Sequence, residues 1–542
     1  MAGAAQGTNA AGLERNRPIS GAGTPFYWSL CAIGLALVLV VLCRTAWLCD
    51  DSYITFRTID NFVHGYGLRW NIDERVQAYT HPLWLIVMLL GRVISGEVYW
   101  TALLLNVASS ISAVGLFAYA MRGRTGALAL GIAAFVSSRA FIDFSTSGLE
   151  NALSHLLLGG FLLTYWSEDV RDRTRSLGIS TGLLLLNRLD LAVLAGAPLL
   201  GEWIANRGSR RAAAIWLVAP LCLWEAFSLL YYGFLFPNTA YAKLNTGVPK
   251  LDLARQGFYY FSNSLRHDPA TLVVIGGAIA VTMIRRQRRD LVLLAGVLAY
   301  LAYVVWIGGD FMTGRFLAAP LYVGVWLLAR PVAASTPLSR PCLAGVAIVA
   351  ISFLGPYTAP IASGRAYGQG DQIFDATLED RGINDERRFY FPYTGMLRAD
   401  RRRGVPVDHP WAEEGRRAGL TGVNVVVRGN VGFYGYMAGP DVHIIDYYAL
   451  AEPLLARLPA KKRWRIGHFV RIMPAGYTES AEAKANRIAD PDLATYEDHL
   501  RLITSGPIWS WARLRMIVHM NLGRDEALLA RYVERLRAAG YQ

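Results

Sequence analysis

The sequence predicts a polytopic α-helical membrane protein with a water-soluble C-terminal domain of mixed α/β structure. Three observations lead to this prediction. Hydrophobic residues make up 53% of the 542 residues and charged residues only 18%, below the roughly 25% of an ordinary soluble chain. The apolar residues fall in long blocks between Tyr27 and Tyr357, and such blocks suit helices that cross a bilayer. After about Pro360 the sequence becomes charged, turn-rich and aromatic.

About eleven membrane crossings are expected, with the N-terminus in the cytoplasm. Cytoplasmic loops carry an excess of Lys and Arg, and eleven crossings put the main basic clusters, such as Arg122/Arg124, on the cytoplasmic side. An odd number of crossings places the C-terminal segment on the opposite, outer side. The candidate spans lie near residues 27–46, 99–121, 125–141, 152–166, 176–188, 191–204, 212–235, 270–284, 291–307, 316–330 and 341–357.

The apolar run at residues 82–95 is left out of this count. It is shorter than the about 20 residues that a spanning helix needs, and counting it would put Arg122 and Arg124 outside. We therefore expect a re-entrant or interfacial helix there.

The predicted organisation has three parts. Residues 1–26 form a cytoplasmic tail, residues 27–357 a membrane domain that contains the first outer loop at 47–81, and residues 358–542 the soluble domain. In the soluble domain the patterns predict strands at 423–427 and 442–445 and helices at 450–456 and 524–539.

The first outer loop is denser in polar residues than a connector requires. Asp50 and Asp51 form an acid pair at the end of the first span, where acids are costly unless they face water, a cation or a partner. The alternative is an acid pair that simply ends the span. Helical spacing from Asp50 places several later polar residues on one face. The candidate substrate contacts in this loop are Arg57, Asn61, His64, Asn71, Glu74, Arg75 and His81.

Further candidate residues of both charges lie in the other outer segments. Arg188 and Asp190 sit within an apolar hairpin, where a purely structural ion pair is the alternative. Asp446 follows a β-like run and either reaches the membrane site or caps a turn. The candidates of these segments are Glu150, Arg188, Asp190, Asn238, Lys243, Asp310, Arg315 and Asp446.

These residues suit a substrate that carries both hydroxyl groups and phosphate. A carboxylate can take a proton from an attacking hydroxyl, and Arg or Lys can neutralise a departing phosphate. The local motifs of phosphate-binding P-loops, serine hydrolases and zinc proteases are absent from the sequence. An outer site lacks ready access to nucleotide-sugars, so a lipid-linked phosphate donor is expected.

The sequence resembles the AftB-like membrane glycosyltransferases, a family that includes the mycobacterial terminal arabinofuranosyltransferase. The motif DDSYITFR at residues 50–57 carries most of this resemblance, with Asn61, Gly65–Leu68, Asn71, Glu74–Val76 and THPLW at 80–84. Weaker support comes from SGLE at 147–150, PNT at 237–239, GDFM at 309–312 and IIDYYAL at 444–450.

This resemblance implies a GT-C fold with the catalytic acid in the first outer loop. Asp50 becomes the expected general base and Asp51 a residue that supports it or shares the role. The implied reaction transfers a sugar, with arabinofuranose favoured, from a polyprenyl-phosphate donor such as decaprenylphosphoryl arabinose to a cell-envelope glycan, with inversion. The implied location is the bacterial inner membrane, with the active site and C-terminal domain in the periplasm. No cofactor is required, although the Asp pair would permit Mg²⁺ or Mn²⁺.

Several alternatives stay open at this stage. The acceptor is a glycan, a lipid or a surface protein, since the loop is also similar to lipid A aminoarabinose and protein-mannosyl transferases. A transporter or flippase for a lipid-linked sugar is a second class, and a glycan-binding accessory factor is a third. The formal net charge of +13 is assigned to cytoplasmic turns and anionic membrane lipids rather than to a nucleic-acid partner.

Overall fold

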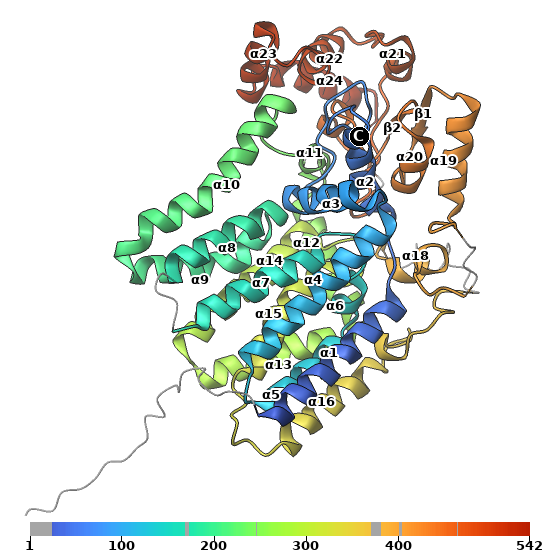
Figure 1. Ribbon diagram of the computed structural model, residues 1–542. Coiled ribbons are helices and arrows are strands. Elements are labelled where there is room, and N and C mark those ends of the chain that lie inside the picture. Colours follow the sequence, from blue (N-terminus) through green and yellow to red (C-terminus); the bar gives the residue numbers. More distant parts are fainter. Residues whose placement is uncertain are drawn as a thin grey trace, which may run out of the picture.

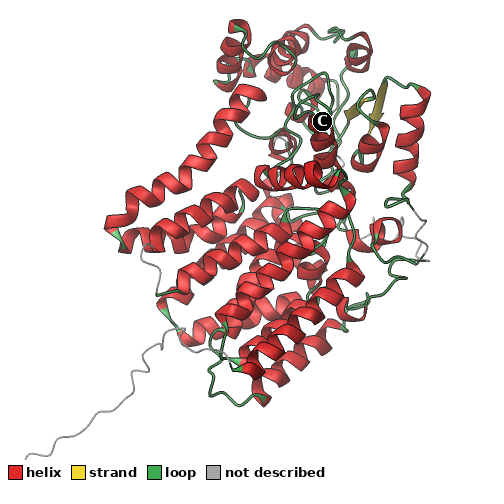
Figure 2. Ribbon diagram, viewed as in Figure 1, coloured by secondary structure: helices red, strands yellow, loops and turns green. Residues whose placement is uncertain are grey.

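The computed structural model describes residues 24–168, 173–244, 246–369, 381–399, 404–462 and 464–541. Residues 1–23 of the predicted cytoplasmic tail therefore lie outside the described residues. In the described part, helices dominate, and the only strands form one short sheet (Figure 2).

Each of the expected spans coincides with a helix. These helices are α1 (Pro25–Thr45), α4 (Tyr99–Ala120), α5 (Thr125–Ser137), α7 (Asn151–Trp166), α8 (Arg173–Asn187), α9 (Leu191–Ala205), α10 (Arg210–Tyr231), α13 (Pro269–Arg285), α14 (Arg288–Ile307), α15 (Ala318–Ala329) and α16 (Ser339–Ser352). Most of them run side by side in the bundle of Figure 1, and α10 rises from the bundle towards α23.

Helix length and hydropathy support fewer membrane crossings than the charge pattern predicts. Within the described residues, four helical segments are long and apolar enough to cross a membrane, namely α1, α4, Arg207–Tyr231 and α14. A fifth results if α12 (Lys250–His267) and α13, which meet at a bend of 110°, count as one span. The structure is thus a helical protein with several candidate spans, and eleven crossings stay a prediction.

Three further helices lie at the upper end of the bundle. They are α2 (Asp50–Val63), α3 (Pro82–Ser95) and α11 (Asn238–Leu244). Helix α3 covers the run expected to be interfacial or re-entrant, and it lies across the direction of the bundle (Figure 1). Pro82 begins α3 and Gly96, with a φ of 79°, ends it, as is usual for these residues at helix termini.

The C-terminal part is mainly helical. Its helices are α18 (Glu386–Thr394), α19 (Pro410–Thr421), α20 (Gly432–Ala438), α21 (Tyr477–Ala483), α22 (Pro491–Thr504), α23 (Trp511–Asn521) and α24 (Glu526–Ala538). Strands β1 (Val425–Arg428) and β2 (His443–Asp446) pair in parallel, with Val425 opposite His443. The helix expected at 450–456 is only a short 3₁₀ turn, Leu455–Arg457.

The first outer loop and the C-terminal segment share one hydrophobic core. Ile54, Trp70 and Ala78 of the loop pack with Val431, Tyr434 and Ile444 among other residues. Because these side chains are buried by one another, the loop and the segment hold each other in place. This packing positions the acid pair at the start of α2.

Candidate active site

Asp50 is buried at the start of α2 and is bound by backbone groups from the other end of the chain. The N–H of Gly432 donates to Oδ2 at 3.0 Å, and the N–H of Phe433 donates to Oδ1 at 2.7 Å. Both groups belong to the first turn of α20. Burial raises the pKa of Asp50 to about 7, although these two N–H groups act to lower it. Both carboxylate oxygens are thus engaged in joining α2 to α20.

The contact between α2 and α20 depends on a glycine. A Cβ atom at position 432 would lie 1.8 Å from the backbone oxygen of Asp50 and 2.9 Å from its carboxylate carbon. No side chain other than hydrogen therefore fits there without separating the two helices.

Gly432→Ala is expected to disrupt this contact and to lower both the midpoint of thermal unfolding and the activity. The physical reason is overpacking against backbone atoms, which costs about 1–3 kcal/mol or more. Differential scanning fluorimetry of the purified protein measures the effect. Gly160→Ala is the matched control, because a Cβ at that helical glycine meets nothing within 4 Å. Equal unfolding midpoints for the two variants would contradict the described contact.

Asp51 has different surroundings from Asp50. Its side chain is half-buried, and no hydrogen bond or ion pair engages its carboxylate within the described residues. Burial raises the pKa of Asp51, and the charges of Lys243 and Arg315 oppose that rise. Asp310 and Glu150 are the nearby acids that add to it. Asp51 therefore lies within electrostatic range of Lys243, Arg315, Asp310 and Glu150.

Glu150 is the centre of a buried charged cluster next to Asp51. Its Oε1 lies 3.0 Å from Nη2 of Arg315 and 3.6 Å from Nη1 of Arg188, and its Oε2 lies 3.5 Å from Nδ1 of His81. Burial acts to raise the pKa of Glu150, but Arg315, His81 and Arg188 outweigh it and hold the pKa at about 2. Glu150 thus carries a full negative charge that Arg315 and Arg188 share, whereas burial lowers the pKa of His81.

The remaining members of this cluster pair among themselves. Arg188 donates to both oxygens of Asp190, at 3.0 and 2.6 Å, and the hydroxyl of Tyr300 donates to Asp190 Oδ2 at 2.5 Å. The ion pair considered for Arg188 and Asp190 is therefore present. Oδ2 of Asp310 lies 3.7 Å from Nη1 of Arg315.

Apart from Lys243, whose charge acts on Asp51, the structure does not bring the other predicted contacts to this cluster. Most are buried and bind backbone groups of distant segments. Arg57 donates to Trp70, Gly435 and Val442 carbonyls; Asn61 to Arg69 and Trp70; Asn71 to Ile444; Arg75 to Tyr231, Ile503 and Gly506; Asn238 to Ala449, Leu450 and Glu452; and Asp446 accepts from Tyr448 and Leu450.

These hydrogen bonds indicate a structural role, and a substrate contact by these residues stays a prediction. Arg57 and Asn71 fix the first outer loop against the C-terminal segment, and Asp446 caps the turn after β2. His64 is exposed at the end of α2 and pairs with Asp60.

Glu74 lies in a separate polar cavity of about 60 Å³. The cavity lies between the first outer loop and the C-terminal segment, and its lining includes Asp73, His443, Glu452 and Glu497. Burial raises the pKa of Glu74 well above its usual range, and nearby Glu452 adds to the rise. Glu74 is therefore not part of the charged cluster at Asp51.

A divalent cation at the acid pair stays a prediction. Both oxygens of Asp50 accept backbone N–H groups of α20. Among the residues that the structure describes, the groups whose ligand atoms gather within 4.8 Å are His499, His519 and Asp525, and Glu74, His443 and Glu452.

Sequence reasoning missed Glu386 at this site. Glu386 is the first residue of α18 and is buried. Burial raises its pKa well above the usual range, and the negative charges of Asp51 and Asp310 raise the pKa further. The sequence signal is the run Asp385-Glu386-Arg387 ahead of an aromatic segment. Asp385 and Arg387 are the partners of Arg139 and Asp143 in a second buried ion network.

Comparison with known proteins identifies relatives along most of the chain. No family model matches the sequence. The sequence is 29% identical over 532 residues to the terminal β-(1→2)-arabinofuranosyltransferase of Mycobacterium tuberculosis, which spans 79% of this chain and 81% of the relative. The chain is a homologue of this glycosyltransferase. It is also 27% identical over 515 residues to the enzyme of the same name from Corynebacterium glutamicum, covering 78% of this chain and 72% of that one.

These relatives confirm the resemblance that the first-loop motifs predict, and with it the glycosyltransferase class. Among solved structures, the chain matches ArnT from Cupriavidus metallidurans. The TM-score is 0.46 for ArnT bound to undecaprenyl phosphate and 0.47 for the apo state, at 13% identity. The two matches cover 78% and 79% of this chain and 86% and 87% of the ArnT chains.

Proposed function

We propose that the chain is an integral membrane glycosyltransferase of the GT-C class that uses a polyprenyl-phosphate sugar on the periplasmic side of the inner membrane. The sugar is arabinofuranose and the acceptor a cell-envelope glycan, in keeping with the names of the two curated relatives. The observation that carries the proposal is the position of Asp51. It is a first-loop carboxylate without a hydrogen-bond partner in the described part of the chain, and the charges of Lys243, Arg315 and Glu150 act on it.

Asp51, rather than Asp50, is the proposed general base. A general base must have an oxygen available to the proton that it accepts, and both oxygens of Asp50 accept backbone N–H groups. Partial burial raises the pKa of Asp51, which makes the carboxylate a better proton acceptor. Asp50 is proposed to orient the start of α2 and thereby to position its neighbour.

The proposed reaction is a single displacement. Asp51 takes the proton of an acceptor hydroxyl while that oxygen forms a bond to the anomeric carbon of the donor. The bond from the anomeric carbon to the phosphate oxygen breaks, and polyprenyl phosphate leaves with the electron pair. A displacement of this kind inverts the anomeric centre, which NMR of donor and product checks.

Lys243 is the proposed partner of the departing phosphate. It is exposed on α11, its charge acts on Asp51, and no hydrogen bond or ion pair to another described residue occupies its ammonium group. Arg315, in contrast, already pairs with Glu150 and Asp310. A free ammonium group beside the base suits a phosphate that gains charge as the sugar departs.

Mass spectrometry of lipids that co-purify with the protein tests the donor class. We expect a polyprenyl-phosphate pentose with the wild-type protein and about 10–100-fold less with Lys243→Ala, the factor that a charged hydrogen bond supplies. Lys461→Ala, which removes another exposed lysine, serves as the matched control and is expected to retain the lipid. Equal amounts of the polyprenyl-phosphate pentose with Lys243→Ala and with wild type would overturn the role of Lys243 in phosphate binding. Recovery of bulk phospholipid alone with the wild-type protein and both variants would contradict the donor class.

A further inference from the structure

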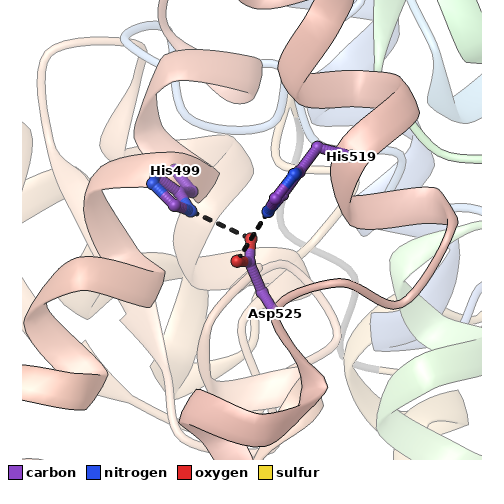
Figure 3. A group of neighbouring side chains, drawn as sticks. All are labelled: His499, His519 and Asp525. Atoms are coloured by element: carbon purple, nitrogen blue, oxygen red, sulfur yellow. Dashed lines mark hydrogen bonds and ion pairs between the residues drawn. The ribbon is translucent and has the colours of Figure 1, made fainter.

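Two histidines and one aspartate converge among the last three helices, far from the acid pair in the sequence. His499 lies on α22, His519 lies on α23, and Asp525 immediately precedes α24. Nδ1 of His499 is 2.9 Å from Oδ2 of Asp525, and Nε2 of His519 is 2.9 Å from Oδ1 (Figure 3). One atom from each residue lies within 4.8 Å of the other two.

The carboxylate of Asp525 is directed at the imidazoles and away from its own helix. Asp is a preferred residue at the start of a helix, where its side chain usually accepts a backbone N–H. Asp525 makes no such capping hydrogen bond. Its carboxylate is 6% exposed, whereas the imidazoles of His499 and His519 are 29% and 34% exposed. The trio thus has a buried acid and an opening to solvent on the histidine side.

We propose that His499, His519 and Asp525 form a Zn²⁺ site that joins α22, α23 and α24. Two imidazole nitrogens and a carboxylate oxygen are a common ligand set for Zn²⁺, with water in the fourth position. Two ligands at about 2.05 Å from a tetrahedral ion are about 3.3 Å apart. The two 2.9 Å separations join the imidazoles to different oxygens of Asp525, and one ligand atom of each residue lies within 4.8 Å of the other two. Rotation of these side chains would bring the three ligand atoms to the tetrahedral spacing, and the partly exposed imidazoles leave room for the water.

The position of the site defines its role. Arg531 and Arg535 of α24 already bind Asp490 and Asp492 at the other end of α22. Arg513 of α23 donates to the carbonyls of Leu230 and Tyr231 at the end of α10. A metal at the trio would therefore fasten α23 to the α22–α24 pair and, through Arg513, hold this helical group on α10.

Zinc content and Zn²⁺-dependent stability of the full-length protein in detergent test this proposal. The protein is purified without a metal-affinity column, stripped with a chelator and titrated with Zn²⁺ against a chromophoric competitor. We expect one zinc per chain and a higher unfolding midpoint with Zn²⁺ than with the chelator. His499→Ala and Asp525→Asn are expected to weaken binding by more than about 100-fold, since even partners outside the ligand shell contribute about 10–100-fold, and to remove the stability shift.

Two variants separate this site from other histidines. His64→Ala removes an exposed histidine that also pairs with an aspartate, and it is expected to keep both the zinc and the shift. His443→Ala disrupts the second group, Glu74, His443 and Glu452 at the polar cavity. This variant is also expected to keep the zinc and the stability shift. Zinc retained by His499→Ala, zinc lost only in His443→Ala, or no binding by the wild-type protein would each overturn the proposal. Visible absorption of the Co²⁺-loaded wild-type protein reports the ligand geometry without reference to stability.

Discussion

Asp51→Asn is expected to lower the rate of sugar transfer by about 10²–10⁴-fold, the usual contribution of a general base. The amide has nearly the shape of the carboxylate but cannot accept the acceptor's proton. Since no described residue binds the Asp51 carboxylate, the midpoint of thermal unfolding is expected to stay close to that of the wild-type protein. Initial rates with a synthetic donor, together with scanning fluorimetry, measure both quantities on the same preparation.

Asp50→Asn provides the matched comparison one residue away. Asn keeps one oxygen for a backbone N–H, but its NH₂ group faces the second N–H at the start of α20. A buried donor left without an acceptor costs about 1–3 kcal/mol, so the unfolding midpoint is expected to fall. Wild-type rates in Asp51→Asn, or a rate loss confined to Asp50→Asn without loss of stability, would contradict the assigned roles.

Glu150→Gln is expected to destabilise the protein by about 3–5 kcal/mol, the cost of removing one partner from a buried ion pair. Glu150 is 2% exposed, and its removal leaves Arg315 and Arg188 with less compensating negative charge. The change in unfolding midpoint in detergent measures the effect. Glu413→Gln on α19 is the control, because Glu413 also binds two arginines, Arg416 and Arg417, but at the surface. There the midpoint is expected to stay almost unchanged, and an equal shift in both variants would contradict the account.

The Glu150 cluster also predicts a direction of pH dependence. The pKa of the Glu150 carboxyl in the folded protein is about 2, below the usual 4.5. The folded state therefore binds this proton less readily than the unfolded state. The stability that Glu150 contributes is fully present above about pH 4.5 and is lost as the pH falls toward 2. Glu150→Gln is expected to flatten this part of the stability profile.

The sequence predicts the positions of the apolar helices well, because helix length and hydrophobicity are local properties. It does not predict α12 as a helix, since that segment is amphipathic and borders an apolar helix at a sharp bend. The strands lie close to their expected positions, whereas the 450–456 segment is shaped by Asn238 and Asp446 hydrogen bonds to its backbone rather than by helix propensity.

The site is predicted only in part. Charge alone draws attention to Glu150, Arg188, Asp310 and Arg315, which the structure brings together. It does not distinguish Asp50 from Asp51, because the N–H groups that bind Asp50 belong to residues 382 and 383 positions away. Arg57 and Asn71 look equally suited to substrate, but their partners are backbone groups that come close only in the folded chain.

Turnover of a synthetic polyprenyl-phosphoryl arabinofuranose by the purified wild-type protein tests the central claim most directly. The assay uses an arabinan acceptor in detergent, where no membrane gradient exists, and measures the release of polyprenyl phosphate. The account predicts release of one polyprenyl phosphate for each sugar joined to the acceptor. Absence of release in detergent, combined with movement of the intact donor across the bilayer when the protein is placed in vesicles, would contradict it and indicate a transporter.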